Sequence, residues 1–263
     1  MGTVAEHLER MGPGRALRGL QRRAGLARAL AVAARAFLAF RRHHPRRFVI
    51  KARDLRLFLR DATIQTGYDR HYVLHIAWAA RVLQELRPTS HVDVASSMYF
   101  VATVSAFVPV TALDIRPAAI ELSGLEYRRG SLHALPFKSG SIESVSCMHV
   151  LEHVGLGRYG DPLDYDGDLK ALAELARVVA PGGHLLIAVP MSGEPRIEFN
   201  AHRVYSFRQF VAMSQAVGLE LREFALIPDD GSEETLIRHA SEAIADRQRY
   251  GCGCFLLGRG SGP

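Results

Sequence analysis

Residues 91–190 decide the fold, and four blocks carry the pattern: HVDVASS (91–97), TALDIRP (111–117), RRGSLHALPFKSGSIESVSCMHVLEHV (128–154) and LARVVAPGGHLLIAVP (175–190). The first three blocks each contain a short apolar run, which is typical of a buried strand. The fourth ends a stretch of helically spaced apolar residues, breaks it with Pro181-Gly182-Gly183, and continues into another apolar run. Strands that alternate with helices predict a doubly wound, Rossmann-like α/β fold with its ligand at the carboxyl ends of parallel strands.

The expected elements follow from the same patterns along the whole chain. Short apolar runs predict strands, and a 3.6-residue period of apolar side chains predicts helices. We expect strands at residues 92–94, 110–114, 142–150, 219–226 and 252–257, the last of them at an edge of the sheet. We expect helices at residues 68–86, 169–179, 206–217 and 236–245, with residues 191–205 as a loop.

Charge divides the 263 residues into two parts. Residues 1–60 contain 15 of the 33 Lys and Arg residues and 3 of the 27 Asp and Glu residues, which gives this segment a formal charge of +12 and the remainder −6. We therefore predict a basic helical extension at residues 1–60 and an α/β domain at residues 61–263. Because that domain is mildly acidic, we expect no nucleic-acid partner.

Residues 16–42 combine apolar side chains with many arginines and contain no acidic residue. This composition favours one of two interpretations: a helix on an anionic membrane surface, or a helical cap packed on the sheet with its arginines in water. Arg28 and Arg35 interrupt the apolar run before it reaches the ~20 residues that span a bilayer. No signal-peptidase site is evident, so we expect a cytoplasmic protein, with membrane-peripheral association through residues 16–42 as an open alternative.

The three cysteines are Cys147, Cys252 and Cys254, and they predict no disulfide framework. Cys252-Gly253-Cys254 is spaced like a metal or redox pair, but the chain has no second pair to complete a zinc site. We interpret these two as part of the last strand, and Cys147 as a small buried residue of an earlier strand.

In this order the four blocks resemble the class I S-adenosylmethionine-dependent methyltransferases, over residues 70–260. Two longer motifs, LEHVGLGRYGDPLDYDGDLKAL (151–172) and FNAHRVYS (199–206), are similar to a branch of that superfamily catalogued as a domain of unknown function. The resemblance implies S-adenosylmethionine as the cofactor. It implies a cofactor site made of Asp93, Ala95, Ser96, Ser97, Asp114, Ile115, Ser131, Leu132 and His149.

The cofactor loop departs from the superfamily pattern. Alternating glycines usually follow the acid of the first strand and let the backbone approach the cofactor, whereas this chain has Ala95, Ser97 and Tyr99 there. Ser131 stands where an acid commonly faces the adenine. Asp114 does match, because it lies about twenty residues after the first acid, where a carboxylate hydrogen-bonds the ribose. Two alternatives therefore remain: a retained cofactor site, or a degenerate fold that binds another nucleotide or none.

Four side chains form the candidate catalytic group. His149, Glu152 and His153 are spaced i, i+3 and i+4, so a helix beginning at His149 would place them on one face, and His202 follows a later strand. A comparable set binds a divalent metal in some O-methyltransferases, and imidazoles with one carboxylate suit Zn, Fe, Mn or Co better than Mg. The same residues otherwise serve as base or substrate orienter, with His153 or His149 taking the acceptor proton, or are purely structural. We expect the four to converge in one cleft without a tightly held metal.

A glycine-rich loop follows this group. It presents Arg158, Tyr159 and Asp161 between glycines, and we interpret these side chains as substrate contacts. Asn200 and Arg203 belong to the second motif, and we expect Arg203 to pair with a carboxylate or phosphate of the acceptor. A phosphorylated or nucleotide-linked sugar suits two arginines.

These observations predict methyl transfer to a small acceptor, with saccharide-linked compounds of glycan or surface-polymer biosynthesis as the candidate class. The alternative is a non-catalytic, methyltransferase-like scaffold at a membrane surface, which the altered glycine loop favours. Asp114 is also compatible with a nicotinamide-dependent oxidoreductase. The G-x-G-x-x-G motif that such an enzyme needs does not follow the first strand, which argues against this function.

Overall fold

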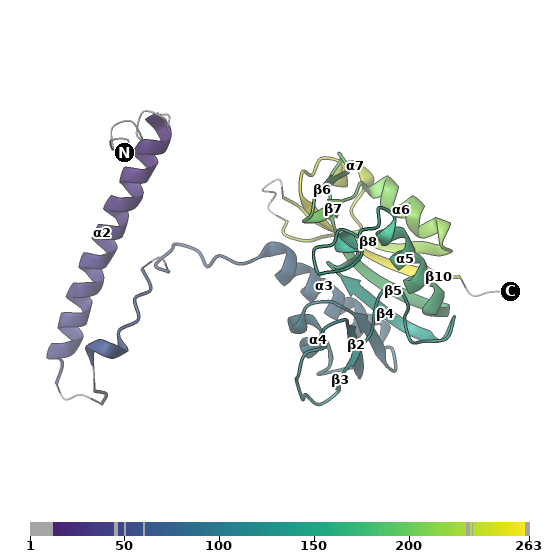
Figure 1. Cartoon of the computed structure of the whole chain (residues 1–263), viewed down its shortest axis with the longest axis horizontal. Coiled ribbons are helices and arrows are strands. Elements are labelled where there is room, and N and C mark those ends of the chain that lie inside the picture. The colour runs from purple at the N-terminus through teal and green to yellow at the C-terminus, as the bar shows by residue number, and fades with distance from the viewer. Residues whose placement is uncertain are drawn as a thin grey trace. The chain divides into compact units, whose positions relative to one another are not determined.

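The structure is a computed structural model of the chain (Figure 1), and it describes residues 13–44, 47–49, 51–59, 61–229, 232 and 234–260, with side chains from residue 23 onward. The chain separates into two compact units, Met1–Gly67 and Tyr68–Pro263. The division predicted after residue 60 falls close to this boundary.

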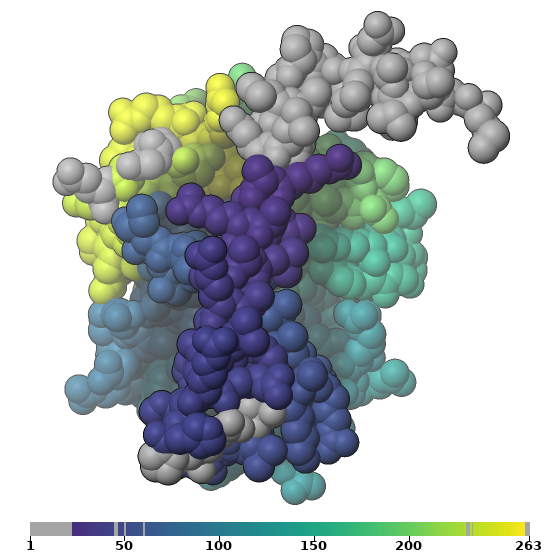
Figure 2. Space-filling model, turned by 90° about the vertical axis from the view of Figure 1, so that its left-hand side faces the viewer, coloured from purple at the N-terminus to yellow at the C-terminus, as the bar shows by residue number. Residues whose placement is uncertain are grey.

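The first unit contains one long helix, α2 (Pro13–Arg42), and a short 3-10 turn, η1 (Ala52–Asp54). Several large apolar side chains of α2, drawn purple in Figure 2, are exposed: Leu26, Leu30, Val32, Leu38 and Phe40. The side chains of residues 16–22, which belong to the membrane interpretation, lie outside the described residues. Among the described helices, none has both the length and the apolar character needed to cross a bilayer.

An eight-stranded sheet forms the centre of the second unit, in the order β3-β2-β1-β4-β5-β10-β8-β9. The strands are β1 (His91–Val94), β2 (Val110–Asp114), β3 (Leu125–Arg129), β4 (Ile142–Met148), β5 (Val179–Met191), β8 (Leu219–Ile227), β9 (Ile237–Arg238) and β10 (Gly251–Arg259). The first five pair in parallel, whereas β10, β8 and β9 join antiparallel. The carboxyl ends of β1 to β4 therefore meet at one edge.

Helices cover both faces of this sheet (Figure 1). On one face, α3 (Arg70–Leu86) and α4 (Met98–Val104) bury Trp78 and Phe100 in one core cluster. On the other, α5 (Gly167–Val178) and α6 (Phe207–Ala216) bury Leu172 and Phe210 in a second cluster. Side chains that alternate along β5 supply both clusters, as buried central strands of a doubly wound sheet do. The predicted doubly wound α/β fold with a helical N-terminal extension is confirmed.

The structure corrects three predicted elements. The last strand, β10, is not an edge strand, because it pairs with β5 on one side and β8 on the other. Residues 236–245 do not form one helix, since they divide into β9 and a single turn, α7 (Glu242–Ala245). The expected loop at residues 191–205 contains a small hairpin, β6 (Arg196–Glu198) and β7 (His202–Val204).

Candidate functional site

A cavity of about 420 Å³ opens at the carboxyl ends of the parallel strands. Its walls are the segments that follow β1, β2, β3 and β4, namely residues 95–97, 114–116, 130–133 and 148–150. This edge, at which ligands of doubly wound sheets bind, lies where the order of the strands reverses between β1 and β4. We call it the first cavity.

The loop after β1 is held by a buried carboxylate. Asp93 is 1% exposed, and it accepts hydrogen bonds from the Ser96 amide (3.1 Å), the Ser96 hydroxyl (2.5 Å) and the Ser146 hydroxyl (2.5 Å). Ala95, at the first glycine position, has φ +60°, the left-handed conformation that glycine adopts most easily. Asp93 thus fixes the loop from beneath and does not itself line the first cavity, which corrects its expected place as a cofactor contact.

Asp114 ends β2 at the wall of the first cavity. One of its carboxylate oxygens accepts the Arg116 amide hydrogen at 2.7 Å, which orients the group, and the side chain remains partly accessible. The other residues predicted for the cofactor line the same cavity: Ala95, Ser96, Ser97, Ile115, Ser131, Leu132 and His149. The structure therefore brings this set together, Asp93 excepted.

A second cavity of about 460 Å³ adjoins the first. Four residues line both cavities and form a shared wall: Tyr72, His149, His153 and Tyr159. The second cavity is otherwise lined by Asp69, Arg70, His71, Glu152, Arg158, Ala201, His202 and Tyr250. The predicted catalytic group, His149, Glu152, His153 and His202, thus converges in one cleft.

The convergence does not arise from helical spacing, as the sequence had suggested. His149 follows β4 in the left-handed conformation (φ +56°), and residues 151–153 form a 3-10 turn, η2 (Leu151–His153). His149 Nδ1 lies 2.8 Å from Glu152 Oε1, and His153 Nε2 lies 3.8 Å from the same oxygen. The His202 ring centroid is 6.2 Å from that of His153. A left-handed residue and a tight turn replace the expected helix.

Burial sets the protonation of this group. Burial raises the pKa of Glu152 to about 7 and lowers the pKa of His149 to about 4. Both nitrogens of His149 are engaged, Nδ1 by Glu152 and Nε2 by the Cys252 thiol at 3.2 Å. His153 Nδ1 lies 2.6 Å from the Ala201 carbonyl oxygen, so this nitrogen carries the proton and Nε2 keeps its lone pair. His153 is therefore better placed than His149 to accept a proton.

Three residues of the predicted substrate loop lie at the cavities. The guanidinium groups of Arg116 and Arg158 both contact the Tyr159 ring, 5.3 and 5.2 Å from its centroid. Arg158 also donates to the Ala201 carbonyl oxygen at 3.0 Å, which connects the loop to the β6–β7 hairpin. Asp161 accepts the Gly155 amide hydrogen at 2.6 Å and lines the first cavity.

Arg203 and Asn200 do not lie with these residues. Arg203 is 5% exposed and donates to the main-chain oxygens of Val154 (2.6 Å) and Tyr165 (2.8 Å), beside the Asp168 carboxylate. These contacts tie the substrate loop to α5, so Arg203 is structural and not available to an acceptor. Asn200 lies exposed in the turn of the β6–β7 hairpin and lines neither cavity.

The contribution of α3 to the second cavity was not predicted from the sequence. Arg70, His71 and Tyr72 begin this helix directly after Asp69, which caps it by accepting the Tyr72 amide hydrogen. Nε and Nη2 of Arg70 are buried and have no hydrogen-bond partner among the described residues. The signal was present in the sequence as DRHY (69–72), a charged and aromatic run ahead of the apolar face of a helix.

Comparisons with known proteins agree with this picture at the level of the fold. Residues 137–222 match the family model "Caenorhabditis protein of unknown function, DUF268". A stretch of 69 residues, 26% of this chain, is 38% identical to an uncharacterised 37.1 kDa protein in transposon TN4556 of Streptomyces fradiae. That stretch spans 17% of the length of the transposon protein.

Two solved structures share the fold. One comes from a complex between the Haloferax volcanii Trm112 methyltransferase activator and a methyltransferase, with 18% identity, 74% of this chain and 91% of that chain covered, and a TM-score of 0.50. The other is the Burkholderia thailandensis 1,6-didemethyltoxoflavin-N1-methyltransferase with bound 1,6-didemethyltoxoflavin and S-adenosylhomocysteine, with 13% identity, coverage of 71% and 79%, and a TM-score of 0.51. The second unit therefore has the fold of class I methyltransferases.

Proposed function

We propose that this protein transfers a methyl group from S-adenosylmethionine, bound in the first cavity, to a small acceptor bound in the second. The observation that carries the proposal is the wall shared by the two cavities, because methyl transfer requires donor and acceptor to meet in line. S-adenosylmethionine supplies an electrophilic methyl group when it is bound. The protein's own contribution is to position both partners and exclude water.

The residues of the first cavity suit this cofactor. Its volume of about 420 Å³ falls within the range of small-molecule sites. Asp114 lies at the end of β2, where an acid hydrogen-bonds a ribose in doubly wound folds. The left-handed backbone at Ala95 keeps the sharp turn after β1 that a glycine usually provides. We assign the cofactor contacts to this turn and to Asp114.

His153 accepts the acceptor proton in this proposal. Its Nδ1–H is fixed by the Ala201 carbonyl oxygen, which leaves Nε2 as the proton acceptor, and the residue belongs to the shared wall. Burial lowers the pKa of His153, so the imidazole is neutral and able to accept a proton near pH 7. Glu152, 3.8 Å from Nε2, then stabilises the imidazolium that forms.

An anionic group on the acceptor would pair with Arg70 and Arg158. Both line the second cavity, and two buried nitrogens of Arg70 have no hydrogen-bond partner among the described residues. A buried guanidinium without partners is costly, and a phosphate or carboxylate relieves that cost through paired hydrogen bonds. The phosphate of a saccharide-linked acceptor is the candidate of this class, in keeping with a role in glycan or surface-polymer biosynthesis.

The N-terminal unit supports a further part of the proposal, a cytoplasmic protein held at an anionic membrane surface through residues 16–42. The described part of α2 exposes Leu26, Val32 and Phe40 on a helix that carries many arginines and no acidic residue. Apolar side chains that enter the headgroup region and arginines that meet anionic lipids suit such a surface.

Calorimetry on the full chain tests the cofactor assignment. We expect S-adenosylmethionine and S-adenosylhomocysteine to bind. Asp114→Ala should make the binding free energy of S-adenosylhomocysteine less favourable by roughly 1–3 kcal/mol, the cost of leaving buried polar partners unpaired. Glu126→Ala, at an exposed position on the neighbouring β3, is the matched control and should bind as the unchanged protein does. If the unchanged protein binds neither compound, the non-catalytic scaffold is the better interpretation.

A further inference from the structure

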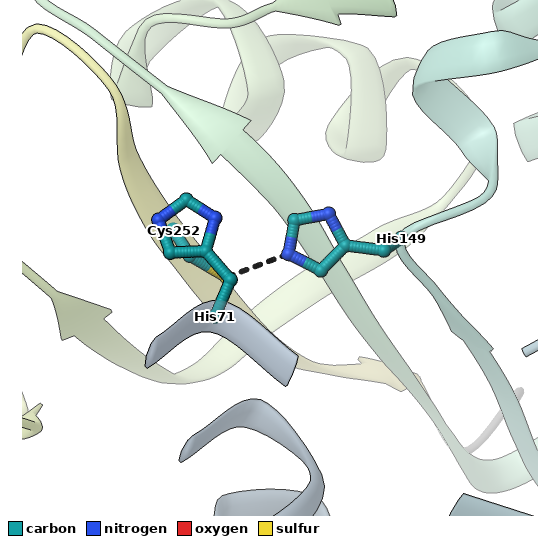
Figure 3. A group of neighbouring side chains, drawn as sticks. All are labelled: His71, His149 and Cys252. Atoms are coloured by element: carbon teal, nitrogen blue, oxygen red, sulfur yellow. Dashed lines mark hydrogen bonds between the residues drawn. The ribbon is translucent and has the colours of Figure 1, made fainter. Parts of the chain in front are cut away.

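A cluster of metal-ligand side chains lies beside the acceptor cavity, on residues far apart in the sequence. His71 lies in the first turn of α3, His149 follows β4, and Cys252 belongs to β10. One ligand atom from each lies within 4.8 Å of the others. Figure 3 shows His71 and His149 beside each other, with Cys252 behind His71 and a dashed line for the His149–Cys252 hydrogen bond.

We propose that His71, His149 and Cys252 bind a divalent transition-metal ion, zinc first among the candidates. Two imidazoles and one thiolate are preferred zinc ligands, and three protein ligands leave a fourth position open, as catalytic zinc sites do. Bond lengths of ~2.0–2.3 Å place the ligand atoms of a tetrahedral site roughly 3.3–3.8 Å apart. The existing separations of up to 4.8 Å need to shorten by at most about 1.0–1.5 Å to meet that geometry.

Neighbouring groups orient the ligands as in known metal sites. His149 Nδ1 lies 2.8 Å from Glu152 Oε1, which leaves Nε2 directed toward Cys252 Sγ at 3.2 Å. The Tyr250 main chain hydrogen-bonds His71. A carboxylate or carbonyl on the far nitrogen of a ligating histidine fixes its ring and strengthens it as a ligand.

A simple thiol–imidazole hydrogen bond explains less of this geometry. It satisfies His149 and Cys252 but does not account for His71, whose ring nitrogen lies within 4.8 Å of both other ligand atoms. Moreover, Glu152 Oε2 and His75 Nε2 are buried without a hydrogen-bond partner among the described residues, and the His75 ring lies 4.9 Å from that of His149. A nearby cation offsets the cost of such buried acceptors.

The fourth position would face the acceptor. Cys252 is fully buried, whereas His71 and His149 line the second cavity together with His153. A bound ion would hold an oxygen or sulfur atom of the acceptor there and favour loss of its proton. Only this role rests on the proposed methyl transfer; binding of the metal does not.

Titration of the full chain with Co²⁺ in the absence of S-adenosylmethionine tests the site, after bound metal has been removed with a chelator and the chelator has been dialysed away. We expect one ion per chain and the near-ultraviolet charge-transfer band of a cobalt–thiolate bond. Cys252→Ser should abolish the band and weaken binding at least about tenfold, and His71→Gln should weaken binding comparably. Cys254→Ser is the matched control, because its sulfur lies 3.9 Å from that of Cys252 but outside the cluster.

Three outcomes would overturn the proposal: no cobalt binding by the unchanged protein, a band that survives Cys252→Ser, or a loss of metal with His202→Gln but not with His71→Gln. The last result would assign the ion to the other histidines of the cavity. Thermal unfolding of each variant checks that it folds, and His71→Gln at the partly exposed start of α3 keeps the test open if Cys252→Ser does not fold. A failed calorimetric titration with S-adenosylmethionine leaves these measurements unaffected.

Discussion

Asp93 makes the stability of the second unit depend on pH in a direction opposite to that of most carboxylates. Its side chain is buried beneath the loop of the first cavity and has hydroxyl and amide partners but no cationic one among the described residues. Burial raises the pKa of Asp93 to about 6, against an ordinary value of 3.8. The folded protein therefore binds this proton more tightly than the unfolded chain does.

The sign of the effect follows from linkage. Between about pH 4 and pH 6 the folded state retains a proton that the unfolded state has lost, so the free energy of unfolding falls as pH rises through this window. A pKa shift from 3.8 to about 6 corresponds to about 3 kcal/mol, at 1.36 kcal/mol for each pKa unit. Asp93→Asn keeps the size of the group and removes its charge. As pH rises from about 4 to about 7, we expect the free energy of unfolding of this variant to increase by about 3 kcal/mol relative to that of the unchanged protein.

Urea unfolding across this pH range, followed by fluorescence, measures the difference. Trp78 is the single tryptophan, it is 1% exposed, and it reports on the core of the second unit. Glu121→Gln, at an exposed position, is the matched control for changing an acid to its amide. A pH-independent difference for Asp93→Asn would refute the reasoning.

Three further predictions concern the loop, the acceptor cavity and the N-terminal unit. Ala95→Gly should raise the free energy of unfolding by up to about 1 kcal/mol, since the left-handed conformation is costly for alanine; a loss of stability in urea unfolding would contradict this. Inorganic phosphate should raise the midpoint temperature of thermal unfolding of the unchanged protein and of Arg81→Met, a variant at an exposed position of α3, but not that of Arg70→Met. An equal rise in all three proteins would exclude Arg70 as the anion contact. Removal of residues 1–45 should preserve the thermal transition and abolish salt-sensitive binding to anionic vesicles, whereas an insoluble product would make the segment part of the core.

The sequence predicts those elements whose signal is local. The strands β1 and β2 are short apolar runs that contain or end in a carboxylate. Ser206 precedes α6 and accepts the Gln209 amide hydrogen as its N-cap. The position of β10 is not local information. Its apolar residues say only that it is buried, and its place between β5 and β8 is decided by antiparallel pairing with strands distant in the chain.

The candidate site divides in the same way. The segments after β1 and β2 are predictable because consecutive residues line one cavity. Cys252 approaches His149 only through the fold, 103 residues along the chain, and His71 comes from a helix to which the sequence assigned no site residue. Arg203 was misassigned for the complementary reason: the sequence shows a charge, but only the structure shows that main-chain carbonyls already satisfy it.

The altered glycine loop favoured a non-catalytic scaffold on the basis of the sequence. Its structure gives that interpretation little support. Ala95 keeps the left-handed backbone of the glycine it replaces, and its amide donates to the Leu113 carbonyl oxygen at 2.7 Å. Ser97 caps α4 by accepting the Phe100 amide hydrogen. Tyr99, the residue that cannot imitate glycine, is 80% exposed on α4 and does not line the first cavity. The substitutions change side chains without closing the space for a cofactor, so they do not by themselves separate an enzyme from a scaffold.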